Sequence, residues 1–215
     1  MRPIFLLYDE GVSQVERDAA ISAIQEVRGI FQNRNLFVLG SKIKVEDFNL
    51  SLELLVQGAP VVRRTTYGDQ IDAERIHSAI YESSLHKKEP FIGIVLVSKD
   101  LTVSIKGQNL NFCFGYTFGD VTVQSVARFR DMPLDDRLTM IKGVIQHELG
   151  HVFNLAGTML RSNTEYNLGM HCTNPGCVMN QGLTRDALLR NFKLAKRMGR
   201  VYCPQCLEDA AEIEG

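Results

Sequence analysis

Apolar positions in the first half of the chain follow two periods, one typical of strands and one typical of helices. The runs Pro3–Tyr8 and Phe91–Val97, and the loosely alternating stretch Asn35–Val45, are typical of strands. The segments Ser13–Phe31 and Asp69–Leu85 instead repeat apolar residues at helical spacing. Because strands and helices alternate along the chain, this half of the sequence predicts an α/β sheet.

The second half begins with a predicted hairpin-like pair of strands, Leu110–Phe118 and Val121–Phe129, joined by a Gly-Asp pair. Asp131 then offers a cap, and Pro133 a first-turn proline, for the most regular helix of the chain, Leu134–Asn154. Five apolar residues form one stripe along it, so we expect this helix to bury one side. The stripe consists of Leu138, Ile141, Ile145, Leu149 and Val152.

After this helix the pattern changes to a polar loop at 156–168, a cysteine-rich turn region and one last helix, Thr184–Arg200. We therefore divide the chain into an N-terminal α/β subdomain, residues 1–154, and a C-terminal subdomain, residues 155–215. No Ser/Gly linker separates the two, so we do not expect them to fold independently.

The composition is ordinary for a globular protein. Of the 215 residues, 45% are hydrophobic and 23% are charged, with a formal net charge of −1. This balance gives no general attraction to nucleic acid or to an anionic membrane, so neither is expected as a partner. No apolar run approaches the roughly 20 residues of a membrane span, and the N-terminal run ends too early for a secretory signal. We therefore expect a cytoplasmic protein, and the sequence leaves its oligomeric state open.

Four of the five cysteines lie close together near the C-terminal end. Cys172 and Cys177 form a C-x4-C pair, and Cys203 and Cys206 form a C-x2-C pair. In a reducing compartment such clusters bind metal more often than they form disulfides. Disulfides or a redox pair remain the alternative. The fifth cysteine, Cys113, lies in an apolar strand and is expected to be a small buried residue.

The strongest chemical signal is the H-E-x-x-H match formed by His147, Glu148 and His151 on the predicted helix. Histidines four residues apart lie on one face of a helix, so both imidazoles reach one ion. Glu148 sits about 100° round from His147, which suits contact with a metal-bound water better than direct ligation. His171 is the candidate third ligand of a catalytic zinc site with one open position. The alternative is a helix with two hydrogen-bonded or surface histidines.

Three other residues carry structural expectations. Gly143 lies one turn before His147 and is expected to leave room at the histidine face of the helix. His77 and His86 lie in or beside a predicted helix and belong to no motif, so we interpret both as ordinary exposed residues.

Taken together, these motifs make the sequence resemble the archaemetzincins, a family of metzincin zinc peptidases. That family carries H-E-x-x-H-x-x-G-x-x-H-C-x4-C-x-M, followed further along by C-x-x-C. The C-x4-C, C-x-M and C-x-x-C spacings are kept here. The segments Gly107–Gly115 and Val121–Arg128 also resemble the family's strand pair before the active-site helix, and the resemblance covers about half of the chain, Gly107–Cys206. The matching residues are His147, Glu148, His151, His171, Cys172, Cys177, Met179, Cys203 and Cys206.

The resemblance implies a catalytic zinc held by His147, His151 and His171, with Glu148 as the general base of peptide-bond hydrolysis. Elementary chemistry agrees with these roles. Three neutral imidazoles leave zinc its full charge, so the pKa of its water falls to about 7. A neighbouring carboxylate takes the proton of that water and passes it to the leaving amine.

The resemblance also implies a second, structural zinc held by Cys172, Cys177, Cys203 and Cys206, which gives two zinc ions per chain. It implies that Met179 forms the Met-turn beneath the catalytic metal. The implied fold is α/β, with a twisted mixed sheet and long helices, including the zinc-binding active-site helix. A small zinc-stapled C-terminal subdomain completes this metzincin-like fold.

The sequence departs from the family pattern in two places, at residue 154 and between His151 and His171. Asn154 stands where the family has the glycine of a sharp turn, and asparagine tolerates left-handed geometry next best. Nineteen residues separate His151 from His171 where the motif has five, so residues 156–169 form an excursion that either shapes or covers the cleft. Gln181 stands where some metzincins have a tyrosine ligand, so we expect three histidines and water.

These observations support two functional hypotheses. The first is a zinc-dependent metallopeptidase that acts on a peptide or protein substrate. The second is a catalytically silent zinc-binding protein with an interaction or regulatory role, its cleft covered by residues 156–169. The stretch Asn111–Phe118 is either a sheet edge that pairs with an extended peptide or an ordinary edge strand.

The adjacency of His171 and Cys172 leads to one further hypothesis. Neighbouring side chains of an extended segment point to opposite sides, so this pair bridges two metal sites. We expect the four-cysteine zinc to fix the backbone that delivers His171 to the catalytic zinc.

Overall fold

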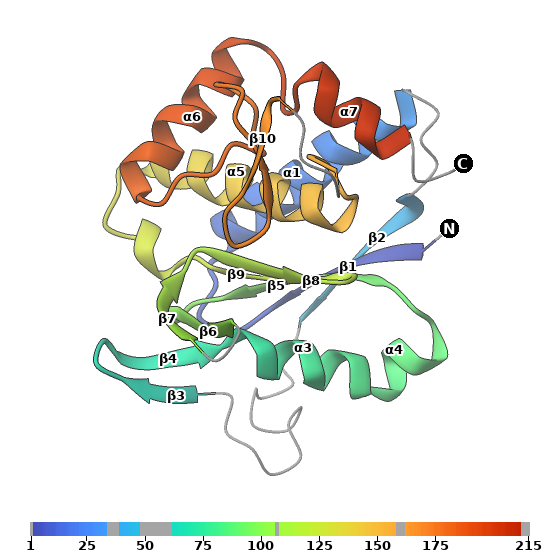
Figure 1. Ribbon diagram of the computed structural model, residues 1–215. Helices are drawn as coiled ribbons and strands as arrows, with labels where there is room; N and C mark the ends of the chain where they lie inside the picture. Colours follow the sequence, from blue (N-terminus) through green and yellow to red (C-terminus); the bar gives the residue numbers. More distant parts are fainter. Residues whose placement is uncertain (1, 34–38, 48–61, 106–107, 158–161, 212–215) are drawn as a thin grey trace.

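The computed structural model describes residues 2–33, 39–47, 62–105, 108–157 and 162–211 of the chain. Its first sheet has the spatial order β2 (Leu39–Asp47), β1 (Arg2–Tyr8), β5 (Ile92–Val97), β9 (Val121–Ser125) and β8 (Gly115–Phe118). The helices are α1 (Gln14–Asn33), α3 (Ala73–Glu82), α4 (Ser84–Lys88), α5 (Leu134–Val152), α6 (Arg185–Arg197) and α7 (Pro204–Ala211). Helices α1 and α5 cover one face of this sheet and α3 covers the other (Figure 1).

Strand direction makes this sheet mixed. Strands β2, β1, β5 and β9 run parallel, and β8 pairs antiparallel with β9. All of β5 is buried, as expected for a strand covered on both faces. A mixed sheet between layers of helices confirms the predicted α/β fold class. Strand β8 ends the order, so one of its edges has no strand partner in the described part of the chain.

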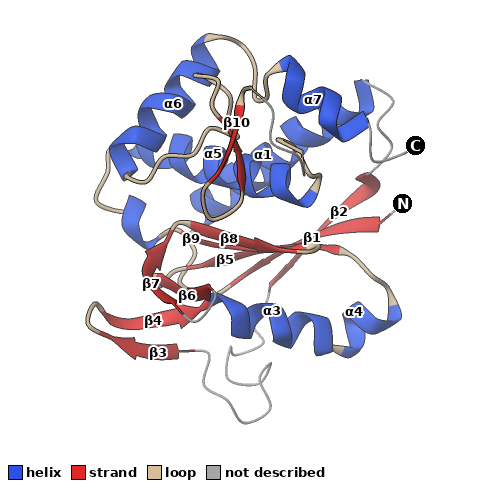
Figure 2. Cartoon of the chain, in the orientation of Figure 1, coloured by secondary structure: helices blue, strands red, loops and turns tan. Residues whose placement is uncertain are grey.

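A second sheet lies beside the first and was not expected from the sequence (Figure 2). Its order is β3 (Val62–Thr65), β4 (Gly68–Asp72), β6 (Leu101–Ile105) and β7 (Gln108–Cys113). The chain passes from β7 into β8 at Phe114. The predicted hairpin is therefore confirmed only for β8 and β9, where Phe118 lies opposite Val121. Its first part pairs with β6 instead, which takes the hydrogen bonds of β7.

Helix α5 begins at Leu134 as predicted, whereas α3 begins later than predicted, and the roles of the neighbouring aspartates explain both starts. Helix α3 begins four residues later than expected because Asp72 caps it, accepting from the backbone N–H groups of Glu74 and Arg75. Asp131 does not cap α5, which begins after Pro133 without a side-chain cap. Asp131 accepts a hydrogen bond from Arg185 instead. The helix α7 near the C-terminus was not expected, because its apolar pattern is short.

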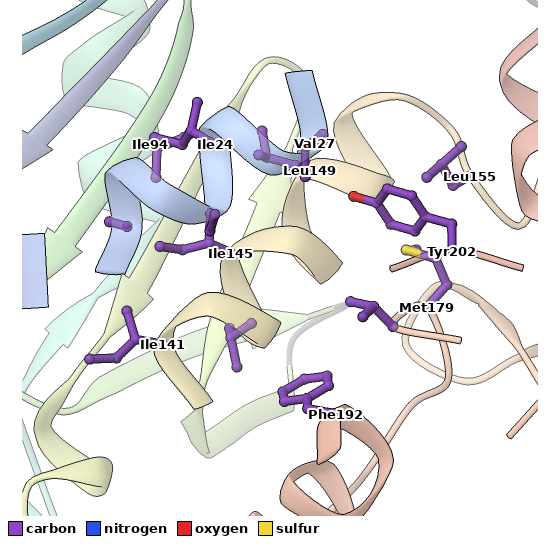
Figure 3. Packing of buried hydrophobic residues seen from close by; sticks show 14 of the residues in the cluster. Ile24, Val27, Ile94, Ile141, Ile145, Leu149, Leu155, Met179, Phe192 and Tyr202 are labelled. Carbon is purple, nitrogen blue, oxygen red and sulfur yellow. The ribbon is translucent and has the colours of Figure 1, made fainter. Parts of the chain in front are cut away.

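One cluster of buried side chains extends from the first sheet through α1 and α5 to the C-terminal segment (Figure 3). The predicted stripe on α5 faces this cluster, with its central residues fully buried and its outer ones partly buried. The labelled members are Ile24, Val27, Ile94, Ile141, Ile145, Leu149, Leu155, Met179, Phe192 and Tyr202. Because the packing is continuous across residue 154, the C-terminal segment gains stability from the same core. The division at that residue stays a prediction.

The space beside Gly143 holds a side chain of α6. A Cβ atom placed on Gly143 would lie 2.2 Å from Cδ2 of Phe192. The expected room on this side of the helix is therefore filled by packing, and it allows α6 to approach α5 closely.

The prediction that His77 is exposed is wrong. Its side chain is 4% exposed, and its ring packs against Tyr81, Tyr116 and Phe118. Burial lowers the pKa of His77 to about 4, and a weak contact with the carbonyl of Tyr116 opposes this only in part. His86 is half-buried and contacts the rings of Tyr81 and Phe91.

Two sequence expectations concern the remaining segments. The predicted strand Asn35–Val45 is confirmed from residue 39 onward as part of β2, and its first four residues lie outside the described residues. Within the described residues, no helix combines the length and apolar character that crossing a membrane requires.

We expect the substitution His77→Phe to flatten the acid side of the stability profile. The unfolded chain takes up a proton on His77 near pH 6.5, whereas the folded chain does so only near pH 4. Wild type therefore loses stability from this residue as pH falls between these values, by up to about 1.4 kcal/mol per pH unit. Urea unfolding at pH 7, 6 and 5 measures the effect. Equal slopes for the two proteins would contradict the assignment.

Candidate functional site

Three imidazole rings converge at the C-terminal end of α5. His147 and His151 come from this helix, and His171 comes from β11 (Met170–Cys172), which pairs antiparallel with β10 (Thr164–Tyr166). The ring centroids lie 4.8 to 5.1 Å apart. The structure thus brings together two residues of one helical turn and a third from beyond a long excursion.

Hydrogen bonds fix which nitrogen of each ring faces the centre. The Nδ1–H group of His147 donates to the carbonyl of Val178 over 2.8 Å, and that of His171 donates to the carbonyl of Gly169 over 3.1 Å. Because a carbonyl only accepts, the neutral form of each of these two rings carries its lone pair on Nε2. Burial, then the neighbouring His147, lowers the pKa of His171 to about 4, and the same causes lower that of His151. The rings of His171 and His151 are therefore neutral, which is the form that binds metal.

The spacing of the nitrogens fits a metal ion. One candidate ligand atom from each of the three rings lies within 4.8 Å of the others. The Nε2 atoms of His147 and His151 are 3.2 Å apart. Two nitrogens that bind one tetrahedral zinc at about 2.0–2.1 Å are separated by about 3.3 Å. This donor set of three imidazoles matches that of catalytic zinc sites.

The carboxylate of Glu148 is buried beside the three rings and held by strand β8. Its side chain is 7% exposed, and Thr117 donates a hydrogen bond of 2.6 Å to Oε2. Gly115 on the same strand gives the carboxylate its space, because a Cβ atom there would lie 2.5 Å from Oε1. Burial raises the pKa of Glu148, while the neighbouring His147 and the hydrogen bond from Thr117 oppose this rise. The result is a buried carboxylate of fixed orientation.

The four predicted cysteines form a second cluster, and all four side chains are buried. The Sγ atoms of Cys172 and Cys203 are 3.7 Å apart, as are those of Cys177 and Cys206. Two thiolates on one tetrahedral zinc, each at about 2.3 Å, are separated by about 3.8 Å, whereas a disulfide brings its sulfurs to about 2.05 Å. The spacing of this cluster fits a closed metal site.

Backbone and amide N–H groups point at these sulfurs. Asn174 donates through its side-chain amide to Cys203 and through its backbone N–H to Cys172, and the N–H of Cys203 donates to Cys177. Hydrogen bonds with the other thiols, above all Cys172, lower the pKa of Cys203, and the Asn174 amide adds to the effect. Donors of this kind stabilise thiolates, the form that binds metal.

A tight turn at residues 177–180 connects the two clusters. The N–H of Asn180 donates to the carbonyl of Cys177, which closes the turn. The two middle residues of the turn each contact one cluster. The carbonyl of Val178 orients the ring of His147, and the carbonyl of Met179 accepts a hydrogen bond from the N–H of Cys172. The side chain of Met179 packs on α5 at Gly150, where a Cβ atom would lie 2.1 Å from its Sδ.

The excursion between His151 and His171 begins with the expected left-handed residue. Asn154 has a φ of 52°, and the N–H of Leu155 returns to the carbonyl of Gly150. Further on, β10 and β11 form a two-stranded hairpin that delivers His171. Gly169, with a φ of 145°, turns its carbonyl toward that ring. Residues 158–161 of the excursion lie outside the described residues.

A cleft of about 740 Å³ extends over the imidazoles and Glu148. This size lies in the range of ligand sites, about 300–1,000 Å³. Its walls come from the end of β7 and all of β8, from α5 and α6, from Leu168 and Gly169 of the excursion, and from residues 181–183. Gln181 lines the cleft near the expected position of an extra ligand, but it does not belong to the three-histidine group.

Three contacts of this site carried no chemical signal in the sequence. They are the bond from Thr117 to Glu148, the close approach of Gly115 to the same carboxylate, and the carbonyl of Val178 that orients His147. Thr117 and Gly115 lie in the predicted strand pair, which was the only available hint. A backbone carbonyl such as that of Val178 leaves no trace in the sequence.

Comparison with known proteins supports the fold. No family model matches the chain, and no curated protein matches it. Solved structures do. An archaemetzincin from Methanopyrus kandleri superposes with a TM-score of 0.63 and 20% identity, covering 98% of this chain and 94% of that chain.

Two further structures agree with the first. A zinc-dependent peptidase from Methanocorpusculum labreanum gives a TM-score of 0.56 at 18% identity, covering 96% of this chain and 99% of that one. An archaemetzincin from Archaeoglobus fulgidus, complexed with malonate, gives 0.54 at 19% identity with the same coverage. The chain therefore has the fold of these proteins over nearly its whole length, as the resemblance in its second half implied.

We expect the double substitution Cys203→Ser with Cys206→Ser to weaken metal binding at the imidazoles as well as at the thiols. The reason is that the turn at 177–180 and β11 position both donor sets. Loss of such support costs about 10–100-fold in metal affinity. Titration with Co²⁺ separates thiolate from imidazole ligation by their spectra, and Cys113→Ser serves as the matched control. An imidazole site of unchanged affinity would refute the coupling.

Proposed function

We propose that this protein is a zinc-dependent metallopeptidase that hydrolyses peptide bonds. One observation carries the proposal: three converging imidazoles and a fixed, buried carboxylate face the same cleft. The names of the structural neighbours, archaemetzincin and zinc-dependent peptidase, support the same activity.

In this proposal His147, His151 and His171 hold the catalytic zinc through the nitrogens that face the centre. When bound, zinc supplies Lewis-acid polarisation of a carbonyl and lowers the pKa of a water to about 7. The ring orientation is set in advance by the carbonyls of Val178 and Gly169, so the ligands lose little freedom on binding.

Glu148 acts as the general base. Thr117 occupies its Oε2 atom, so Oε1 is the atom that takes a proton from water and later returns it to the leaving amine nitrogen. Burial raises the pKa of this carboxyl and makes it a stronger base than an exposed one. Strand β8 therefore fixes the direction in which the proton moves.

Cys172, Cys177, Cys203 and Cys206 hold a second zinc with a structural role, which gives two ions per chain. A closed set of four thiolates leaves no open position for substrate, so this site stabilises and does not catalyse. Met179 forms the turn beneath the catalytic metal, where it packs on α5. The expected cytoplasmic location suits reduced thiols.

The second hypothesis, a silent zinc-binding protein with a covered cleft, has one observation in its favour. Leu168 and Gly169 of the excursion line the cleft. Glu148 and its partner Thr117 weigh on the other side, because binding without turnover requires neither. The enzyme is therefore the better-supported function.

We expect Glu148→Ala to abolish most peptidase activity while metal content stays unchanged. Loss of a general base costs about 10²–10⁴-fold in rate, and this carboxylate is not among the three imidazole donors. Turnover of a quenched peptide library by the zinc-loaded protein measures the effect, with the exposed Glu82→Ala as control. No turnover by wild type, or equal turnover by both proteins, would favour the silent binding protein.

Removing the hydroxyl of Thr117 is expected to lower kcat with little change in KM. A hydrogen bond to a charged group contributes about 1.5–3 kcal/mol, so Thr117→Val should slow turnover by about 10-fold or more. Thr117→Ser keeps the donor and should restore most of the rate. Steady-state kinetics on one cleaved peptide measures kcat and KM for wild type and for both Thr117 variants. If valine and serine behave alike, the hydroxyl does not position Glu148.

A further inference from the structure

Two aromatic rings line the cleft close to the point where Gly115 contacts the carboxylate of Glu148. Phe112 is near the end of β7, and Phe114 lies at the passage into β8, directly before Gly115. Their ring centroids are 5.7 Å apart with an interplanar angle of 68°. Strand residues advance by about 3.3 Å each, so both rings start within a few residues of the point where the backbone touches Glu148.

Each of the two rings packs against a neighbouring side chain, Phe112 against Arg128 and Phe114 against Phe129. The guanidinium of Arg128 lies 3.9 Å from the centroid of the Phe112 ring. Asp100 holds that guanidinium through two hydrogen bonds, from Nε over 2.8 Å and from Nη2 over 2.5 Å. Phe114 stacks on the fully buried Phe129 at 5.6 Å. The rings are therefore pre-organised, and a side chain that binds them does not have to order them first.

The cleft offers little to a charged side chain. Among the described residues, no lysine or arginine lines the cleft, and its acidic residues are Glu148 and Asp120. Arg128, which contacts the Phe112 ring, is paired with Asp100. An acidic side chain would find no basic side chain among the described lining residues, whereas an apolar one would find aromatic surface.

Exposed apolar side chains also gather at this cleft. Nine large hydrophobic residues are exposed in the described part of the chain, and five of them line the cleft, so exposed apolar surface is concentrated where a ligand binds. The five are Tyr67, Phe112, Phe118, Leu168 and Leu183.

We infer that Phe112 and Phe114 form a subsite for an aromatic or large aliphatic side chain of the peptide, close to the bond that is cleaved. This inference deepens the proposed function and rests on it, because a cleaved bond near the subsite presupposes peptidase activity. The substrate class is an extended peptide segment with such a side chain and without acidic residues next to it. Phe112 is the specificity-determining residue, because it is 36% exposed, lines the cleft and packs against Arg128.

A binding experiment tests the subsite without requiring turnover. Fluorescein-labelled Gly/Ser octapeptides carry Phe, Leu, Ala or Asp at one central position and are titrated into zinc-loaded Glu148→Ala protein. We expect the Phe peptide to bind about 10-fold or more tightly than the Ala peptide, with the Asp peptide weakest. Adding Phe112→Ala should reduce this preference to below about 3-fold, and adding Phe112→Leu should preserve the binding of Leu.

Leu134→Ala, an exposed leucine of α5 outside the cleft, is the matched control and should leave the preference intact. An equal affinity for Phe and Ala peptides would overturn the inference, and so would a preference that survives Phe112→Ala. Quenched versions of the same peptides, given to the protein with Glu148 present, test the proposed function separately. A binding preference for the Phe peptide without any turnover would refute the proposed peptidase activity but would still support the subsite.

Discussion

The backbone at residues 171 and 172 carries one residue of the imidazole cluster and one of the cysteine cluster, and the geometry of the site depends on this shared segment. His171 and Cys172 are consecutive residues of β11, and the amide of Cys172 is bound by the carbonyl of Met179. The turn that contains Met179 also supplies Cys177 and the carbonyl that orients His147. We therefore expect a shift of one cluster to move the other. The four buried thiols therefore act, in our proposal, as the fixed point from which the third imidazole is aimed.

The carboxylate side of the site depends on close approach between a helix and a strand. Glu148 on α5 reaches β8 because Gly115 has no side chain, and Thr117 then binds it. Strand β8, which holds the proposed base, is also the edge of its sheet in the described part of the chain. If a peptide pairs with this edge, substrate placement and proton transfer would, in our proposal, depend on the same strand.

Burial sets the protonation preferences of the imidazoles, the carboxylate and the thiols, and it also costs folding free energy. His147, His171, Glu148 and the four thiols are buried, His151 is partly buried, and burial by itself disfavours the charged form of each group. A neutral imidazole offers a lone pair to a cation, and in our proposal metal binding offsets part of the cost of burying these groups. The continuous apolar cluster around α5 supplies the stability that holds such a site in place.

Local sequence patterns were sufficient to predict the candidate ligands and the helix that carries two of them. Helical spacing in H-E-x-x-H places His147 and His151 on one face, and the apolar stripe on α5 fixes which side is buried. The family resemblance implied a sharp turn at position 154, and Asn154 adopts left-handed geometry there with a φ of 52°.

Tertiary structure decided everything that depends on distant segments meeting. Residues 164–172 form a hairpin, β7 pairs with another sheet instead of the expected strand, and His77 becomes buried against β8. Thr117, Gly115 and the carbonyl of Val178 gain their roles only from the neighbours that packing brings to them. Periodicity reports which face of an element is buried, whereas the partner of that face is set by long-range packing, which a local pattern does not encode.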